Sequence, residues 1–124
     1  MGLPTSKDSS AVFGSVSFTA MTSALDALSM RQRVIAHNIA NVQTPGYQAR
    51  RVDFENTLAA AVRQGSGSVA PSIGVSLEPT REDGNNVNLD TEVISNTDTS
   101  LRYQLATRAV EGTFTSLRTA MRSA

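Results

Sequence analysis

Cysteine and tryptophan are absent from this sequence of 124 residues, and histidine occurs once. Without cysteine the chain forms no disulfide and offers no thiolate as a nucleophile or metal ligand. His37 alone cannot complete a metal site, and the sequence contains neither a His-x-x-His pair nor a Gly-x-x-x-x-Gly-Lys phosphate loop. We therefore predict that the protein is not an enzyme and has no catalytic residue, cofactor or metal site.

An excess of charge of either sign is also lacking, because eleven basic residues balance eleven acidic ones. A balanced chain has no electrostatic reason to bind nucleic acid or an anionic membrane, so we expect neither partner. No apolar run approaches the roughly 20 residues that span a bilayer, which argues against direct bilayer insertion. The first residues also lack the basic start and apolar core of a cleaved signal peptide.

Neither glycine nor proline occurs between Gly14 and Pro45, and this interval predicts a helix over about residues 17–41. Its apolar residues alternate in steps of three and four, which is the spacing of a heptad seam. The predicted assembly seam of this helix contains Phe18, Met21, Leu25, Leu28, Ile35 and Ile39, with Gln32 in the same row. Residues 1–16 are assigned to an N-terminal extension.

A second interval without proline predicts a long helix over about residues 89–122. Asn88 is the expected N-cap, and acidic residues in the first turn with arginines in the last match the helix dipole. Asp98 and Arg102 form a favourable pair one turn apart. The seam of this helix contains Leu89, Val93, Tyr103, Val110, Phe114, Leu117 and Met121, interrupted by Asn96, Ser100 and Thr107 and widened by Leu101 and Leu105.

The middle segment, residues 42–88, holds most of the glycine and proline and is expected to be irregular. A short helix is predicted between Asp53, as N-cap, and Gly65, just past the C-terminal end. Alternating Ile73, Val75 and Leu77 indicate a small β element, and the Asp-Gly-Asn-Asn stretch after Glu82 indicates a turn.

These elements predict a mainly α fold with residues 17–41 and 89–122 paired in a coiled-coil-like axial domain. At 1.5 Å per residue the two helices would be ~37 Å and ~50 Å long. A closed hairpin, in which each seam buries the other, is one interpretation. The lengths and the wide second face favour the other interpretation, in which both seams also contact neighbouring chains.

A turn with several specific polar residues ends the first helix. Asn38 and Asn41 are expected to satisfy the last helix carbonyls, since asparagine is favourable at helix ends. Pro45 prevents helix continuation, and Pro-Gly suits the centre of a type II turn with Gly46 at positive φ. Tyr47 is expected to hold the turn against a helix.

The stretch that contains this turn resembles the N-terminal signature of the axial proteins of the bacterial flagellar rod and hook. The hallmark of that family is Ala-Asn-x-x-Thr-Pro-Gly-Tyr after a heptad-patterned helix. It is carried here by Ala40, Asn41, Thr44, Pro45, Gly46 and Tyr47. Within the family, the later Val-Asp-Phe (52–54), Asp-Gly-Asn (83–85), Leu-Asp-x-Glu (89–92) and Ser-Leu-Arg-Tyr-Gln (100–104) resemble the proximal rod proteins of the FlgB type.

The resemblance implies a structural subunit of the basal-body proximal rod that assembles helically, transmits torque and lines the export channel. The implied partners are further copies of the chain, other rod proteins, the rod adaptor FliE and the flagellar export gate. The implied location is the periplasmic rod, reached by type III export without a cleaved signal. Alternatives are a rod protein of the FlgC type, which shares the hallmark, and a self-contained helical-hairpin adaptor or secretion chaperone.

Overall fold

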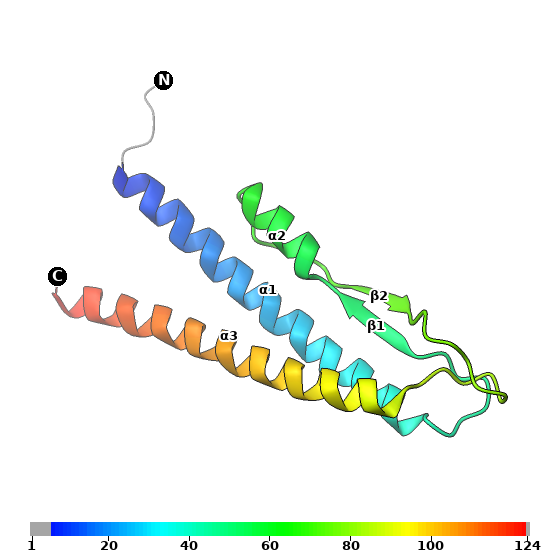
Figure 1. Ribbon diagram of the computed structural model, residues 1–124. Helices are drawn as coiled ribbons and strands as arrows, with labels where there is room; N and C mark the ends of the chain where they lie inside the picture. Colours follow the sequence, from blue (N-terminus) through cyan, green and yellow to red (C-terminus); the bar gives the residue numbers. More distant parts are fainter. Residues whose placement is uncertain (1–5, 124) are drawn as a thin grey trace.

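The computed structural model describes residues 6–123 as two long antiparallel helices with a small irregular module between them. The helices are α1 (Ser6–Ala40) and α3 (Leu89–Ser123). The module contains β1 (Arg50–Asp53), α2 (Glu55–Arg63) and β2 (Ser72–Val75). Figure 1 shows α3 along one side of α1 and the module along another. The predicted mainly α class, with a short helix and a small β element in the middle, is confirmed.

The first helix begins at Ser6 and not near Ser17, so most of the predicted N-terminal extension is helical. Residues 1–5 of that extension lie outside the described residues. The prediction took Gly14 as a boundary, but a single glycine inside a helix costs only about 1 kcal/mol. No proline follows Pro4 in this stretch, so the chain has no backbone reason to stop the helix there.

The second long helix begins and ends close to its predicted bounds. The side-chain oxygen of Asn88 accepts a hydrogen bond from the backbone N–H of Thr91 at 3.3 Å, so the predicted N-cap is confirmed. Asp98 and Arg102 form the predicted ion pair at 2.9 Å. Four threonines and Ser123 donate their hydroxyl hydrogens to the carbonyl one turn earlier: Thr97, Thr107, Thr113, Thr119 and Ser123.

The module differs from its prediction at the start of α2, because the N-cap position is Phe54 and not Asp53. Asp53 belongs to β1, where it pairs with Ser72 of β2. The carboxylate of Glu55 accepts a hydrogen bond from the Phe54 N–H at 3.3 Å, and its negative charge stabilises the N-terminal end of the helix. Gly65 follows the helix at φ 87°, as expected of a glycine just past a helix end.

The hydrophobic core lies where α1 meets the module, and not along the α1–α3 seam. Ala27 and Leu28 of α1 pack with Val52 and Phe54, and Ala106 of α3 lies against this cluster. A further contact holds the loop after α2 on α1. A Cβ atom on Gly67, which has φ 68°, would lie 2.6 Å from the carbonyl oxygen of Val16. The module is therefore fastened to α1 at two places.

The two predicted seams do not bury one another. On α1, Leu28 and Ile35 are buried, whereas Phe18, Met21, Leu25 and Ile39 are half-buried. On α3, Val110 is half-buried, and the large apolar residues Leu89, Val93, Leu101, Tyr103, Leu105, Phe114, Leu117 and Met121 are exposed. The least exposed positions of α3 are mostly short or polar, among them Ser95, Thr99, Ala106 and Thr113. These small side chains allow α3 to approach α1 closely. Because the large apolar residues of α3 stay exposed, the closed-hairpin interpretation fails for α3.

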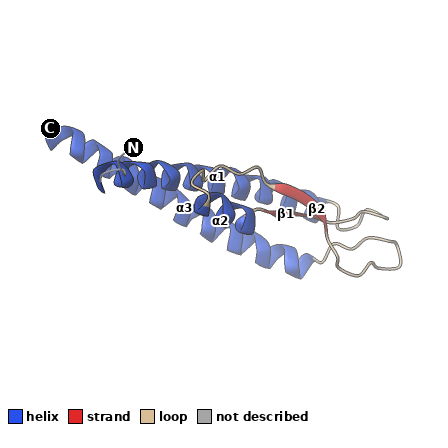
Figure 2. Ribbon diagram, turned by 90° about the horizontal axis from the view of Figure 1, so that it is seen from above, coloured by secondary structure: helices blue, strands red, loops and turns tan. Residues whose placement is uncertain are grey.

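One aromatic pair joins the halves of the two long helices that lie away from the connecting turns. The rings of Phe18 and Phe114 meet edge to face, with centroids 5.6 Å apart and an interplanar angle of 86°. Figure 2 shows the helix pair from above, with the long connecting turns at the end opposite to the start of α1 and the end of α3. The molecule therefore has a turn end and an open end.

Candidate assembly site

The hallmark turn closes α1 with its own side chains. The side-chain amide of Asn41 donates to the His37 carbonyl at 2.8 Å, which confirms its predicted role at the helix end. The Thr44 hydroxyl donates to the Asn41 side-chain oxygen at 3.0 Å. Gly46 has φ 75°, and the Tyr47 N–H donates to the Thr44 carbonyl at 3.2 Å. The predicted Pro-Gly turn with positive φ at glycine is thus present.

A second turn, residues 81–87, packs directly on the first. The side-chain amide of Asn85 donates to the carbonyls of Asn41 and Thr44, both at 2.8 Å. The side-chain oxygen of Asn85 accepts from the Val87 N–H at 2.8 Å. One fully buried side chain therefore satisfies polar groups of both turns, because an asparagine amide can donate and accept at the same time.

Two glycines allow this close approach. The Gly46 N–H donates to the Asp83 carbonyl at 2.8 Å. A Cβ atom on Gly84, which has φ 82°, would lie 3.4 Å from the Cα of Gly46. Positive φ at both positions and the short distance between them favour residues without side chains. The Pro-Gly turn and the Asp-Gly turn therefore fit one another as a pair.

Asn86 joins the second turn to the strands. The Ala49 N–H donates to the Asn86 side-chain oxygen at 2.6 Å, and the Asn86 amide donates to the Ser76 carbonyl at 3.2 Å. Ala49 and Ser76 directly precede and follow the β1–β2 pair. The carboxamide thus takes the place of a peptide group at the end of the ladder.

Asn38 connects α1 to the hallmark turn, to β1 and to α3. Its oxygen accepts from the Arg50 N–H at 3.0 Å and from the Tyr47 hydroxyl at 3.3 Å. Its amide donates to the Arg50 carbonyl at 2.9 Å and to the Glu92 carboxylate at 3.1 Å. Tyr47 therefore contacts α1 as predicted. Asn38 was expected to satisfy the helix end, but it faces the module because β1 lies directly beside this turn of α1.

Asn38, Asn85 and Asn86 form what we call the asparagine cluster, and their exposed fractions are 1%, 0% and 3%. No buried side-chain polar atom within the described residues lacks a hydrogen-bond partner. The sequence pattern predicts a helix end at Asn38 and a turn at Asn85 and Asn86, since asparagine is common in both places. Their burial could not be read from those patterns.

Glu92 lies beside this cluster on the inner side of α3. Burial raises the pKa of Glu92 above its usual value of 4.5, and the hydrogen bond from Asn38 opposes that rise. Glu55 behaves in the opposite way. The hydrogen bonds from Arg31 lower the pKa of Glu55 to about 2. Protonation of Glu55 therefore lowers the stability of the fold, whereas protonation of Glu92 raises it.

Arg31 of α1 fastens the start of the module. Its guanidinium binds both Glu55 oxygens, at 2.5 and 2.9 Å, and donates twice to the Val52 carbonyl, at 3.2 and 2.7 Å. It also lies 4.8 Å from the centre of the Phe54 ring. A planar guanidinium can make these contacts together, which a lysine could not.

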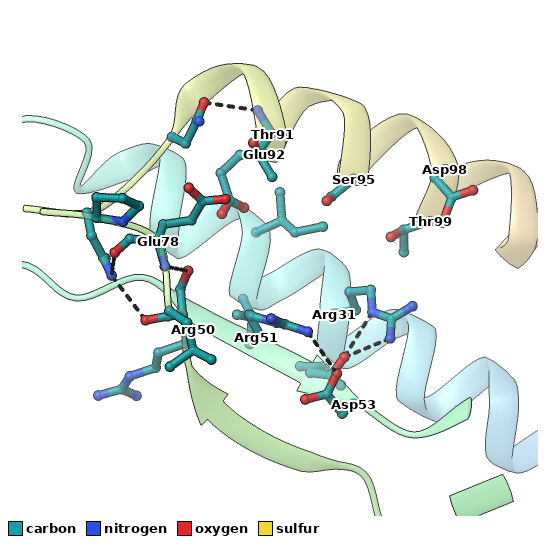
Figure 3. Close-up of a pocket in the computed structure, with 18 residues that line it drawn as sticks. Arg31, Arg50, Arg51, Asp53, Glu78, Thr91, Glu92, Ser95, Asp98 and Thr99 are labelled. Carbon is teal, nitrogen blue, oxygen red and sulfur yellow. Dashed lines mark hydrogen bonds and ion pairs between the residues drawn. The ribbon is translucent and has the colours of Figure 1, made fainter. Parts of the chain in front are cut away.

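A cavity of about 530 Å³ opens between α1, β1, α3 and the chain after β2. Figure 3 shows Arg31, Glu92, Ser95 and Thr99 around it, with Arg51 and Asp53 on the β1 side. Its charged lining is mixed in sign, and groups of three or more metal-ligating side chains do not occur among residues 6–123. The lining of the cavity, as far as the structure describes it, therefore offers no cluster of metal ligands.

α3 also carries an exposed apolar surface. Leu105 and Met121 are each 71% exposed and Leu117 is 56% exposed. Together with Leu89, Val93, Ile94, Leu101, Tyr103 and Phe114, these are the exposed large apolar residues of α3. They extend over more than one side of the helix, and we call this surface the open face of α3. Scattered single apolar residues are normal on a surface, but nine large ones on one helix indicate a binding surface. Within the described residues, none of the helices contains an apolar stretch long enough to cross a bilayer.

The hallmark and the helix before it match a known family. Residues 19–48 match the sequence model of the family described as "Flagella basal body rod protein". The chain is 36% identical to flagellar basal body rod protein FlgB of Escherichia coli in an alignment that covers 72% of this chain and 80% of that protein. It is 29% identical to FlgB of Bacillus subtilis in an alignment that covers 82% of this chain and 89% of that protein. FlgB of Salmonella typhimurium is 36% identical over 66% of this chain and 75% of its own length.

Proposed function

Since the chain belongs to the FlgB family of flagellar basal body rod proteins, and is thus a structural subunit of the rod, we propose that it assembles helically in the proximal rod through α1 and α3. The observation that carries this proposal is the open face of α3. A helix of 35 residues with its large apolar side chains exposed is stabilised when neighbouring chains cover them.

The turn end of the molecule also supports the proposal, because it is rigidly connected. There the asparagine cluster and Arg31 fix the module on α1 with satisfied polar contacts. The hallmark residues Ala40, Asn41, Thr44, Pro45, Gly46 and Tyr47 belong to this fixed end. Their proposed role is to hold α1, α3 and the module at set angles, so that copies present the same surface to the next subunit.

We propose further copies of the chain, other rod proteins, the rod adaptor FliE and the flagellar export gate as partners. The support is the family resemblance together with the size of the open face. In such an assembly the packed helices transmit torque and surround the export channel. A FlgC-type protein and a self-contained adaptor or chaperone are less well supported, because the related proteins are of the FlgB type and a self-contained hairpin would cover its own apolar residues.

A single charge on the open face tests the role of α3. Leu117→Asp should reduce incorporation into isolated basal bodies at least tenfold and abolish swimming, because an aspartate buried between subunits has no partner. The unfolding free energy of the soluble chain should change by less than about 0.5 kcal/mol, since Leu117 is exposed there.

Ser116→Asp is the matched control, since it places the same charge on the neighbouring exposed residue. Incorporation of Leu117→Asp at the wild-type level would contradict the proposal. Loss of the soluble fold in the same variant would instead show that the chain covers Leu117 by itself.

We also propose that the chain reaches the periplasmic rod through the flagellar export apparatus and is not cleaved on the way. The support is the similarity to flagellar basal body rod proteins. The intact mass of the subunit extracted from basal bodies tests this, because cleavage would remove the first residues and lower that mass.

A further inference from the structure

The two-stranded sheet of the module has two edges, and the chain treats them differently. In an antiparallel pair, the backbone N–H and C=O of successive residues point alternately toward the partner strand and away from it. The registers are Arg50↔Val75, Arg51↔Gly74, Val52↔Ile73 and Asp53↔Ser72. Which residues point away is fixed by the hydrogen bonds at the ends of the pair.

The Ser76 N–H donates to the Ala49 carbonyl at 2.8 Å, so position 76 points inward. Ser72 and Gly74 therefore also point inward, because the alternation has a period of two. The backbone groups of Ile73 and Val75 then point away from β1. On the other strand, Arg50 and Val52 point away from β2 by the same rule.

The outer edge of β1 is occupied by side chains of α1. The Asn38 side chain accepts a hydrogen bond from the N–H of Arg50 and donates one to its C=O. The Arg31 guanidinium donates to the C=O of Val52. Figure 1 shows β1 between α1 and β2, so the edge of β1 that points away from β2 faces α1. Side chains thus satisfy this edge, and it is closed to another strand.

The outer edge of β2 is open. Among residues 6–123, the structure records no hydrogen-bond partner for the outward backbone groups of Ile73 and Val75. Their side chains are 51% and 60% exposed, and that of Leu77, next in the alternation, is 92% exposed. Figure 2 shows β2 at the surface of the module.

The composition of this edge also lacks the usual protection. Proteins commonly guard exposed edges with charged side chains, especially lysine. Residues 64–77 contain no charged residue at all. Pro71 stands before the strand, where it does not interrupt the outward groups of Ile73 and Val75.

We propose that β2 binds an extended segment of a neighbouring protein chain, which adds a third strand to the sheet. The unpaired backbone groups favour a strand, because an extended segment offers N–H and C=O groups at the spacing of a strand edge. In the part of the chain that the structure describes, no side chain bonds this edge, unlike the edge of β1. The uncharged edge requires an uncharged segment with apolar side chains at alternate positions. Ile73 and Val75 lie on the same face as the buried Val52, so the added side chains would extend the apolar surface of the module.

The added strand is not β2 of a second copy. Pairing an edge with the same edge of another copy is a two-fold contact, and it closes after two molecules. A rod in which every copy points the same way needs a contact between different surfaces. This step rests on the proposed function, and the occupant is therefore a different extended segment of an adjacent rod subunit.

A proline at an outward position separates backbone pairing from side-chain contact. Val75→Pro removes an N–H that faces away from β1, and proline is tolerated at such edge positions. The soluble chain should keep its circular dichroism and its unfolding midpoint, whereas incorporation into isolated basal bodies should fall at least tenfold. Val75→Thr is the matched control, because it keeps the N–H and the branched shape, and it should incorporate within twofold of wild type.

Amide exchange gives a readout that side-chain docking would not produce. The amides of Ile73 and Val75 should exchange rapidly in the soluble chain and at least a hundredfold more slowly in isolated basal bodies. Wild-type incorporation of Val75→Pro, or rapid exchange of both amides in basal bodies that contain the chain, would overturn the inference and leave the rod assignment intact. Absence of the wild-type chain from basal bodies would overturn both.

Discussion

The turn end and the open end of this molecule reverse the usual arrangement of polar and apolar groups. At the turn end, three asparagines are buried and fully hydrogen-bonded. Toward the open end, leucine, phenylalanine and methionine side chains of α3 lie exposed. A buried polar cluster specifies one geometry, because each donor needs its own acceptor. An exposed apolar surface specifies little until another chain covers it.

The comparison indicates a division of roles between the two ends of the molecule. The turn end sets angles between α1, α3 and the module before any partner arrives. The open end contributes area for contacts with neighbours. If this division is correct, substitutions in the two turns and the module should lower the stability of the soluble chain, and substitutions on the open face should lower assembly alone.

Removal of Asn85 should give the largest loss of stability. Asn85→Ala leaves the N–H of Val87 without its partner and removes one of two hydrogen bonds from each of the carbonyls of Asn41 and Thr44. An unsatisfied buried N–H costs about 1–3 kcal/mol and each further lost hydrogen bond about 1 kcal/mol, so we expect a loss of roughly 3 kcal/mol. Urea unfolding followed by circular dichroism measures it. Asn96→Ala, at an exposed position of α3, is the control and should change stability by less than about 0.5 kcal/mol.

Gly67 should give the next largest effect. Gly67→Ala combines positive φ with a clash against the Val16 carbonyl oxygen, so we expect a loss of about 1–3 kcal/mol or more. Gly65→Ala is the matched control, because φ is also positive there but the space around the added Cβ is open. The difference between the two variants measures the contact between the loop and α1. Equal losses would show that this contact does not fasten the module.

The two glutamates should give the smallest effects, with opposite dependence on pH. The pKa of Glu55 is lower in the folded chain, so its ion pair stabilises the fold above about pH 4.5, and this contribution is lost as the pH falls toward 2. Glu55→Gln should therefore cost about 1 kcal/mol at pH 7, because a half-exposed ion pair is weakened by solvent. The cost should shrink below pH 4.5.

The pKa of Glu92 is higher in the folded chain, so its ionised form destabilises the fold near neutral pH. This cost is relieved as the pH falls through the raised pKa, and it is gone below about 4.5. Glu92→Gln should therefore be as stable as wild type or more so at pH 7, with a difference that narrows on acidification. Thermal unfolding from pH 7 to pH 3 tests both variants. The same pH dependence for both would contradict the assignments of Arg31 and burial as the causes.

Sequence patterns predicted the parts of this fold that depend on local preferences. The period of apolar residues located α1 and α3, Asn88 was found as a cap, and Pro45 with Gly46 was found as a turn. What they could not supply was the identity of neighbours. The heptad pattern of α3 marks Leu101, Leu105 and Leu117 as apolar, but it does not say whether α1 or another chain covers them.

The candidate site shows the same limit more clearly. Asn38 and Asn85 are 47 positions apart, and Asn85 reaches the hallmark turn only because residues 81–87 pack on it. An asparagine at a turn and an asparagine inside a buried cluster look alike in a sequence. Strand β1 was also missed, because Arg50 and Arg51 do not resemble a buried strand and its outer edge is satisfied by α1 side chains.

The hydroxyl groups of α3 bear on how easily this helix can lose its water. Each of Thr97, Thr107, Thr113 and Thr119 has already given its hydroxyl hydrogen to a carbonyl of its own helix. A neighbour that packs over them need not provide an acceptor, so the dehydration penalty for these polar residues is small. In contact, a threonine-rich helix of this kind behaves much like a hydrocarbon surface, although in solution it remains wettable.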